Sequence, residues 1–149
     1  MLLQALRAPF YRSYRKRLKV LLQIPEEASD QRVQNLIESG FSASCFKKFC
    51  ELTKITPKER NLIISAATLK IRTAAGQHLA SDESHRLFGV AHIYATALAI
   101  FGDEEKATRW LSKQKNSLSG KTPMELAFAP QGVQQVEEML IQLAEGLAL

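Results

Sequence analysis

The segment SDESHRLFGVAHIYATALAIFG (residues 81–102) decides the fold, because it is the longest helical stretch of the chain. Ser81 is a suitable cap, Asp82 and Glu83 favour the first turn, and Gly102 is suited to the end of the helix. Apolar residues occupy most of its circumference, with Val90, Ala91, Tyr94, Leu98 and Phe101 among them. A helix that is apolar on nearly every face is buried, so we expect this one at the centre of the protein.

Helical periodicity continues on both sides of this segment, and no clear strand-like alternation occurs. The pairs Thr56-Pro57 and Thr122-Pro123, each with a glutamate three residues after the threonine, indicate two helix starts. We therefore predict an all-α fold. The other expected helices are Tyr11–Gln23, Asp30–Gly40 with Asp30 as cap, one from Ser42 that buries Cys45, Phe46, Phe49, Cys50 and Leu52, then Pro57–Ile64, Ala67–Ala75, one capped by Asp103, and one after Gly132 with a buried stripe of Val133, Val136, Leu140, Leu143 and Leu147.

The composition is that of an ordinary globular chain, with 46% hydrophobic and 23% charged residues. No run approaches the length that spans a membrane. The N-terminal stretch is apolar first and basic afterwards, which is the wrong order for a secretory signal. Cys45 and Cys50 lack metal or redox spacing and are expected as buried free thiols in a reducing compartment, so we expect a cytoplasmic protein.

Charge is distributed unevenly along the chain. Residues 1–24 hold six basic residues and no acid, residues 42–72 hold seven basic and two acidic residues, and residues 122–149 hold four acids and no base. A basic front half suggests a polyanion such as nucleic acid as a partner, while a simple solvated face remains an alternative.

The search for catalytic chemistry yields little. His78, His85 and His92 recur every seven residues, but in a helix each step of seven is about 10.5 Å along the axis. Side chains so far apart do not share a metal ion. Phosphate-binding glycine loops and the common hydrolase motifs are missing from the sequence. We therefore expect neither an enzyme nor a cofactor.

The segment Pro57–Ala75 has the size and order of a helix-turn-helix, whose second helix enters the major groove of DNA. Any two packed short helices give a similar pattern, so the local basic charge is what favours the DNA interpretation. The predicted DNA-binding residues are Thr68, Lys70 and Arg72 on the second helix, Lys58 on the first, and Arg15 and Arg17 on the N-terminal basic segment.

The C-terminal third resembles a known family. AIFGDEEKA (residues 99–107) with Trp110-Leu111, then LSGKTPMEL (residues 118–126), and finally QGV and VEEML (residues 131–133 and 136–140) with Gly146 occur in the order of the toxin-binding domain of Xre/MbcA/ParS-type antitoxins. TLKIR (residues 68–72) and LASDESHRL (residues 79–87) are similar to the region that precedes it. The resemblance extends from about Ser42 to the end and is closest to Xre antitoxins of the RES–Xre class.

This resemblance implies a Cro-like helix-turn-helix joined to a small helical toxin-binding domain. It also implies a RES-type toxin as partner, similar to ADP-ribosyltransferases and depleting NAD, whose active site the antitoxin covers with its C-terminus. The expected segments are a basic N-terminal helical arm (residues 1–41), the helix-turn-helix region (42–98) and the toxin-binding domain (99–149).

The sequence of the tail fits such a role. If Gly146 ends the last helix, a short apolar peptide with an acidic residue beside it projects from the domain. That peptide suits a basic pocket built for a pyrophosphate. The expected toxin-binding residues are Trp110, Glu145, Gly146, Leu147, Ala148 and Leu149, with core packing as the alternative for Trp110 and packing or fraying as the alternative for the tail.

The chain departs from the family pattern at Ala67, where arginine is frequent, and at Ser65, where proline is frequent. DNA binding is therefore less firmly implied than toxin binding. We predict an antitoxin that also binds its operator DNA as a homodimer. A helix-turn-helix regulator without a toxin, and an interaction module without DNA binding, remain as alternatives.

Overall fold

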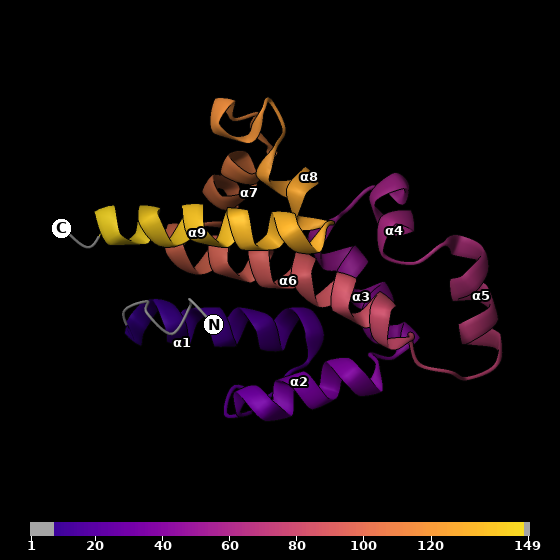
Figure 1. The fold of residues 1–149 in the computed structure, drawn as a ribbon. Helices are drawn as coiled ribbons and strands as arrows, with labels where there is room; N and C mark the ends of the chain where they lie inside the picture. Colours follow the sequence, from indigo (N-terminus) through magenta and orange to yellow (C-terminus); the bar gives the residue numbers. More distant parts are fainter. Residues whose placement is uncertain (1–7, 148–149) are drawn as a thin grey trace. The chain divides into compact units, whose positions relative to one another are not determined.

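The computed structural model describes residues 8–147, with the backbone alone for Leu147, and all of its regular elements there are helical (Figure 1). This confirms the predicted all-α fold. The helices are α1 (Ala8–Leu22), α2 (Asp30–Ser39), α3 (Ala43–Thr53), α4 (Pro57–Ile63), α5 (Ala66–Ala74), α6 (Ser81–Phe101), α7 (Glu104–Ser112), the short 3-10 helix η2 (Asn116–Leu118), α8 (Pro123–Ala127) and α9 (Pro130–Leu147).

The chain forms two compact units. Lys19–Phe88 make up one, here called the middle unit, and residues 8–18 with 89–147 belong to the other, here called the tail unit. The boundaries fall inside α1 and α6. Each unit is described by itself below.

In the middle unit, the first turns of α6 hold several segments together. The hydroxyl of Ser84 accepts a hydrogen bond from the backbone N–H of Phe41 at 3.0 Å, and Arg86 Nε donates to the Ile63 carbonyl at 3.0 Å. Gly40 approaches the chain before α6 so closely that a Cβ there would lie 2.1 Å from the Leu79 carbonyl oxygen. Its φ of +91° also favours glycine.

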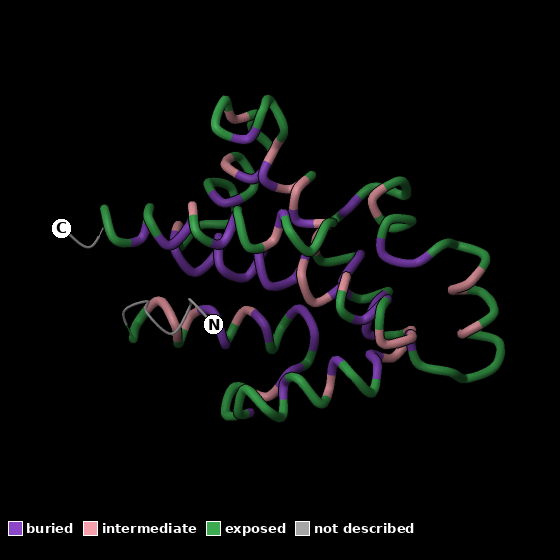
Figure 2. Tube along the Cα trace, viewed as in Figure 1, coloured by how far each residue is buried: buried purple, intermediate pink, exposed green. Residues whose placement is uncertain are grey.

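In the tail unit, α6 is the buried element that the sequence predicts. Every residue from Val90 to Ile100 is buried, and the tube at the position of α6 is correspondingly purple in Figure 2. α8 packs against both α7 and α9. A Cβ added at Gly89 of α6 would lie 3.0 Å from the Val133 side chain of α9, so these two helices also pack closely.

Local caps explain most of the helix starts. Thr56 and Glu59 form a complete capping box, Thr122 accepts from the Glu125 N–H, and Asp103 accepts from the Glu105 N–H, as expected.

Two predicted caps were wrong by one residue. The cap of α2 is Ser29, whose hydroxyl accepts from the Arg32 N–H at 3.1 Å, and Asp30 is the first helical residue. Ser81 is likewise the first residue of α6, while the N–H of Ala80 before it donates to Glu83 at 2.7 Å.

The prediction for the last helix needs correction at both ends. α9 begins at Pro130, so Gly132 lies in its first turn, and it continues through Gly146 to Leu147. Gly146 therefore does not end the helix. Two residues assigned to buried faces, Leu52 and Leu143, are each 38% exposed.

Ile141 and Ala144 are buried in α9 in addition to Val136 and Leu140. The buried face of α9 is thus turned slightly from the predicted stripe. Cys45 and Cys50 are buried free thiols, as predicted.

Among the described residues, none of the helices has both the length and the apolar composition needed to cross a membrane.

Candidate nucleic-acid and protein interfaces

The helices α4 and α5 form a two-helix element with a tight connection in the middle unit. Thr56 begins α4 with its capping box, and Pro57 occupies the first helical turn. Ser65 begins α5 by accepting a hydrogen bond from the Thr68 N–H at 3.1 Å. The Asn61 side chain accepts from the Ala66 N–H at 3.2 Å and so links the two helices directly. A capped helix, a short turn and a second capped helix follow one another in the order that a helix-turn-helix has.

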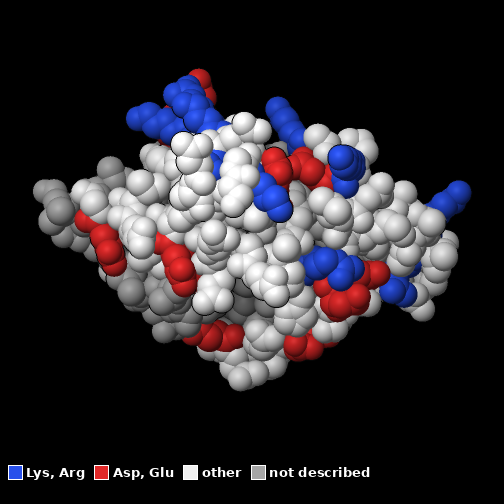
Figure 3. Space-filling model, turned by 45° about the horizontal axis from the view of Figure 1, so that its top comes forward, with Lys and Arg blue, Asp and Glu red and all other residues white. Residues whose placement is uncertain are grey.

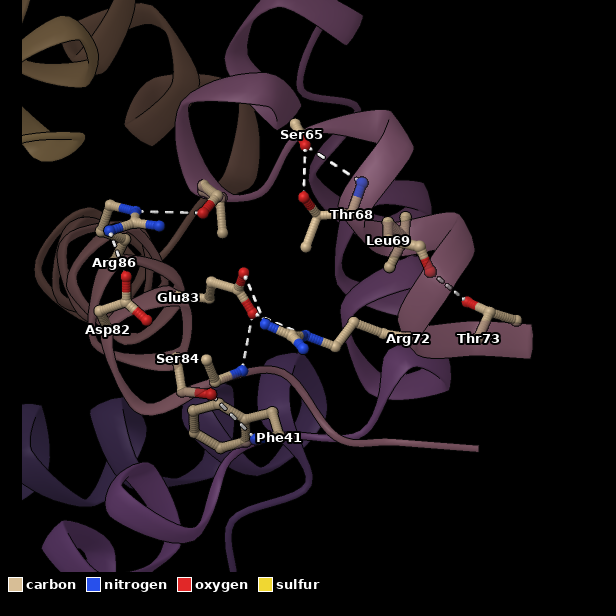
Figure 4. Close-up of polar contacts among 12 residues, drawn as sticks. Phe41, Ser65, Thr68, Leu69, Arg72, Thr73, Asp82, Glu83, Ser84 and Arg86 are labelled. Carbon is tan, nitrogen blue, oxygen red and sulfur yellow. Dashed lines mark hydrogen bonds and ion pairs between the residues drawn. The ribbon is translucent and has the colours of Figure 1, made fainter. Parts of the chain in front are cut away.

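The side chains of α5 are at most half-buried, and an ion pair ties the helix to α6. None of its nine residues, all of which the structure describes, is buried. Arg72 reaches from α5 to Glu83 on α6, with distances of 3.4 Å from Nε to Oε1 and from Nη2 to Oε2 (Figure 4). Glu83 is only 9% exposed and its carboxylate also accepts from the Ala80 N–H at 2.7 Å. The ion pair therefore connects the position of α5 to the start of α6.

The predicted DNA-binding residues of α4 and α5 do not all share one surface. The Thr68 hydroxyl accepts a hydrogen bond from Ser65 at 2.8 Å, and Arg72 pairs with Glu83, so both side chains face the rest of the middle unit (Figure 4). Lys70 and Lys58 are exposed. The structure thus separates Lys70 from the two residues predicted beside it in sequence.

The same unit carries several exposed cations. Besides Lys58 and Lys70, four further basic side chains are exposed on α3, on α4 and in the segment between them: Lys47, Lys48, Lys54 and Arg60. Glu59 is engaged in the capping box of α4. On the face drawn in Figure 3, basic side chains form separate groups with acidic side chains close to several of them, so the positive charge is local.

A pocket of about 450 Å³ lies among α3, α4 and α5 in the middle unit. Phe46, Cys50, Ile64 and Leu69 contribute its apolar wall, and Arg60 is one of its polar residues. Burial raises the pKa of the Cys50 thiol to about 11. A thiol with so high a pKa is almost entirely protonated at neutral pH and is a poor nucleophile or metal ligand there.

The two arginines predicted on the N-terminal segment belong to the tail unit, not to the unit that holds α4 and α5. Arg15 is 7% exposed, and its Nη1 donates to the Tyr11 hydroxyl at 3.4 Å. Arg17 is half-buried, whereas Arg12 and Lys16 on the same helix are exposed. On this part of α1 the basic side chains open to solvent are therefore Arg12 and Lys16, and not the predicted Arg15 and Arg17.

A buried polar trio joins three helices of the tail unit. The ring of His92 on α6 bonds through Nδ1 to the Tyr14 hydroxyl of α1 at 2.7 Å, and through Nε2 to the Glu137 carboxylate of α9. His92 is 3% exposed, Tyr14 1% and Glu137 9%, so these three side chains offer almost no surface to a ligand. A satisfied buried network of this kind fixes the helices that it connects.

Sequence reasoning missed this trio. Glu137 was not among the predicted site residues, and the spacing of seven between His85 and His92 was used only to exclude a shared metal ion. His78 and His85 instead bond to the Gly40 carbonyl and to the Glu38 side chain, both at 2.8 Å. Within residues 8–147, no three His, Cys, Asp or Glu side chains are arranged to hold a metal ion. The signal that was available was a histidine inside the strongly apolar helix α6.

Trp110, predicted to bind the toxin, is half-buried in α7. Its ring centroid lies 6.0 Å from that of Phe101. Lys115 Nζ lies over the Trp110 ring, 5.0 Å from its centroid. Burial lowers the pKa of Lys115. These contacts use part of the indole for packing and leave the remainder at the surface.

The end of α9 is exposed. Glu145 and Gly146 are exposed, and apart from its own helix and chain neighbours no described atom lies within 4 Å of a Cβ built at Gly146. Ala148, Leu149 and the side chain of Leu147, which complete the predicted toxin-binding set, lie outside the described residues.

Comparisons with known proteins agree with this architecture. Residues 96–146 match the model of the antitoxin Xre/MbcA/ParS C-terminal toxin-binding domain. The whole chain is 50% identical to a protein named Antitoxin Xre from Pseudomonas putida, over 100% of this chain and 94% of the relative. Full-length similarity at this level shows common descent of both units. The chain belongs to the Xre antitoxin family of toxin–antitoxin systems.

Proposed function

We propose that this protein neutralises a RES-type, NAD-depleting toxin by placing the end of α9 over the toxin's active site. The observation that carries this proposal is the exposed end of α9, which belongs to the family's toxin-binding domain up to residue 146. A pocket that accepts a pyrophosphate offers basic groups, to which Glu145 is complementary. The residues after Gly146 are apolar, so they suit the wall of such a pocket.

The continuous helix changes how the tail reaches its target. Because α9 runs through Gly146, Glu145 and Leu147 are presented on a helix and not on a loose peptide. An ordered segment loses less conformational entropy on binding. We therefore propose a helical plug.

Co-expression with the RES-type toxin from the neighbouring reading frame tests this proposal. The protein without residues 146–149 should keep its fold and still bind the toxin, but cellular NAD should fall and growth should stop. Glu138→Gln, an exposed change on the same helix, serves as the control and should neutralise fully. Full protection by the truncated protein at equal abundance would exclude the plug.

We also propose that the protein regulates its own operon in the cytoplasm by binding operator DNA as a homodimer. The capped pair α4–α5 supports this, together with the exposed cations Lys58 and Lys70. Two copies are expected because helix-turn-helix proteins usually read paired half-sites. Predicted contacts at Thr68, Arg72, Arg15 and Arg17 stay predictions, and the positions of Thr68 and Arg72 suit a role in orienting α5.

Binding to a duplex from upstream of the protein's own reading frame tests the second activity. Lys70→Ala should weaken binding uniformly across sequences and reduce its salt dependence if the lysine contacts phosphate. Arg72→Ala should weaken binding by releasing α5 from Glu83. Equal affinity of both variants and the unchanged protein would refute α5 as the DNA-contacting helix.

A further inference from the structure

One face of α5, here called its outward face, is largely apolar although it is exposed to solvent. Ala67, Lys70, Ile71 and Ala74 are spaced as i, i+3, i+4 and i+7, so they lie on one side of the helix. All four are exposed, and Ile71 is 63% exposed. The opposite side carries the half-buried Thr68, Leu69 and Arg72, as the close-up shows (Figure 4).

The chemistry of this face is three apolar side chains and one cation. It lacks the arginine, asparagine or glutamine side chains that read guanine and adenine through paired hydrogen bonds. Thymine differs from the other bases in the major groove by its 5-methyl group, which apolar side chains recognise by contact. Ala67, Ile71 and Ala74 therefore match thymine better than any other base.

Charge around the helix identifies the kind of partner. Lys47, Lys48, Lys54 and Lys58 are exposed in the same unit, and the segment 42–72 has a net charge of +5, from seven basic and two acidic residues. A unit with this excess of exposed cations suits a polyanion, and in a major groove phosphates border the base edges that an apolar helix face contacts. A purely apolar protein partner would leave these lysines without counter-charge.

We infer that the outward face of α5 reads thymine methyl groups, with Ile71 as the specificity-determining residue and Ala67 and Ala74 permitting close approach of the helix. This inference rests on the proposed operator binding and adds what the operator must contain. Each half-site should carry thymines at the positions that face Ile71. Lys70 beside it adds a single point contact to a phosphate or a base acceptor.

The test replaces thymine by deoxyuridine, which removes the methyl group and leaves base pairing intact. The probe is a duplex from upstream of the protein's own reading frame, with the bound segment located by footprinting, and affinity is measured by fluorescence anisotropy at fixed salt. For the unchanged protein, each contacted thymine that is replaced should weaken binding about fourfold, the value expected for burying one methyl-sized group.

Variants show which residue makes the contact. At the thymines that face residue 71, Ile71→Ala should lose most of the deoxyuridine effect, because the larger apolar side chain that contacts the methyl group is gone. Leu62→Ala, which changes another exposed apolar residue (52% exposed) on α4, is the matched control and should keep the full deoxyuridine effect. Circular dichroism confirms that both variants are folded.

The outcomes separate this inference from the proposal on which it depends. Operator binding with equal affinity for thymine and deoxyuridine duplexes would overturn the role of Ile71 and leave DNA binding intact. Failure to bind any upstream duplex would overturn both. A deoxyuridine effect that Ile71→Ala retains in full would place the methyl contact on another residue and overturn the role of Ile71. An altered oligomeric mass of that variant with unchanged DNA affinity would assign the face to a protein contact instead.

Discussion

Replacing Gly132 by alanine should destabilise the tail unit, because α9 begins directly against the end of α8. A Cβ at Gly132 would lie 2.0 Å from the Leu126 carbonyl oxygen and 2.7 Å from its carbonyl carbon. These are backbone atoms, so no rotamer change relieves the clash. The two helices must move apart, which disturbs the contact that α8 makes with both of its neighbours.

The magnitude follows from two opposing effects. Overpacking of this kind costs about 1–3 kcal/mol, and the better helix propensity of alanine returns up to about 1 kcal/mol. We therefore expect a net loss of about 1–2 kcal/mol in the free energy of unfolding. For a chain of this length that loss lowers Tm by about 2–8 °C.

Gly146→Ala is the matched control, since it makes the same change in the same helix where the space is open. It should leave Tm unchanged or raise it slightly. Thermal and urea unfolding followed by circular dichroism measure both variants, and a chain with two units can show two transitions, of which that of the tail unit should shift. If Gly132→Ala melts at or above the temperature of the unchanged protein, the close approach of α8 and α9 is refuted.

Three further predictions concern buried polar groups and caps. Tyr14→Phe removes the hydroxyl that bonds to His92 Nδ1 and should lower the free energy of unfolding by about 1–3 kcal/mol in urea, whereas an unchanged value would contradict the buried trio. Burial raises the pKa of Cys45 and Cys50 to about 11 from 9.0, so the thiols of the unfolded chain ionise first as the pH rises. The contribution of these thiols to the free energy of unfolding is therefore fully present below pH 9 and is lost as the pH rises towards 11. Over this range the free energy of unfolding should fall less in a Cys45→Ala, Cys50→Ala variant than in the unchanged protein. Thr56→Ala removes the capping bond of α4 and should cost about 1 kcal/mol, measured by the same unfolding curves, with Thr56→Ser retaining stability.

Helix starts were predictable where the chemistry is local. Thr56 and Thr122 each cap a helix whose first residue is proline, and Asp103 caps α7, because a short side chain and the N–H two or three residues later need no help from the rest of the chain. The buried α6 was predictable for the same reason, since its composition alone excludes solvent on nearly every side.

Glycines were misread because the same residue serves two purposes. At a helix end glycine permits a positive φ, and inside a helix it permits close approach of another segment. Gly132 serves the second purpose, against Leu126, which no local pattern reveals. Gly146 serves neither purpose in the described structure, because α9 continues through it. The expectation that it ends α9 rested only on the residue type.

The face of α5 could be predicted only in part. The sequence placed Lys70 and Arg72 together because they are two residues apart. In the structure Arg72 turns to Glu83, eleven positions along the chain, and an ion pair across that distance depends on how α5 and α6 pack. What the sequence did contain was the spacing of Ala67 and Ile71, which defines the opposite face.

The trio in the tail unit bears on where the toxin-binding part of the chain begins. The family domain matches residues 96–146, and the expected third segment starts at residue 99. Glu137 lies inside both ranges, but its partner His92 and the Tyr14 hydroxyl beyond it lie outside them. A fragment that starts at residue 99 would leave a buried carboxylate without its imidazole, which is strongly unfavourable. The compact unit that contains the family domain therefore includes residues 8–18 and 89–98, of which the family match covers only 96–98.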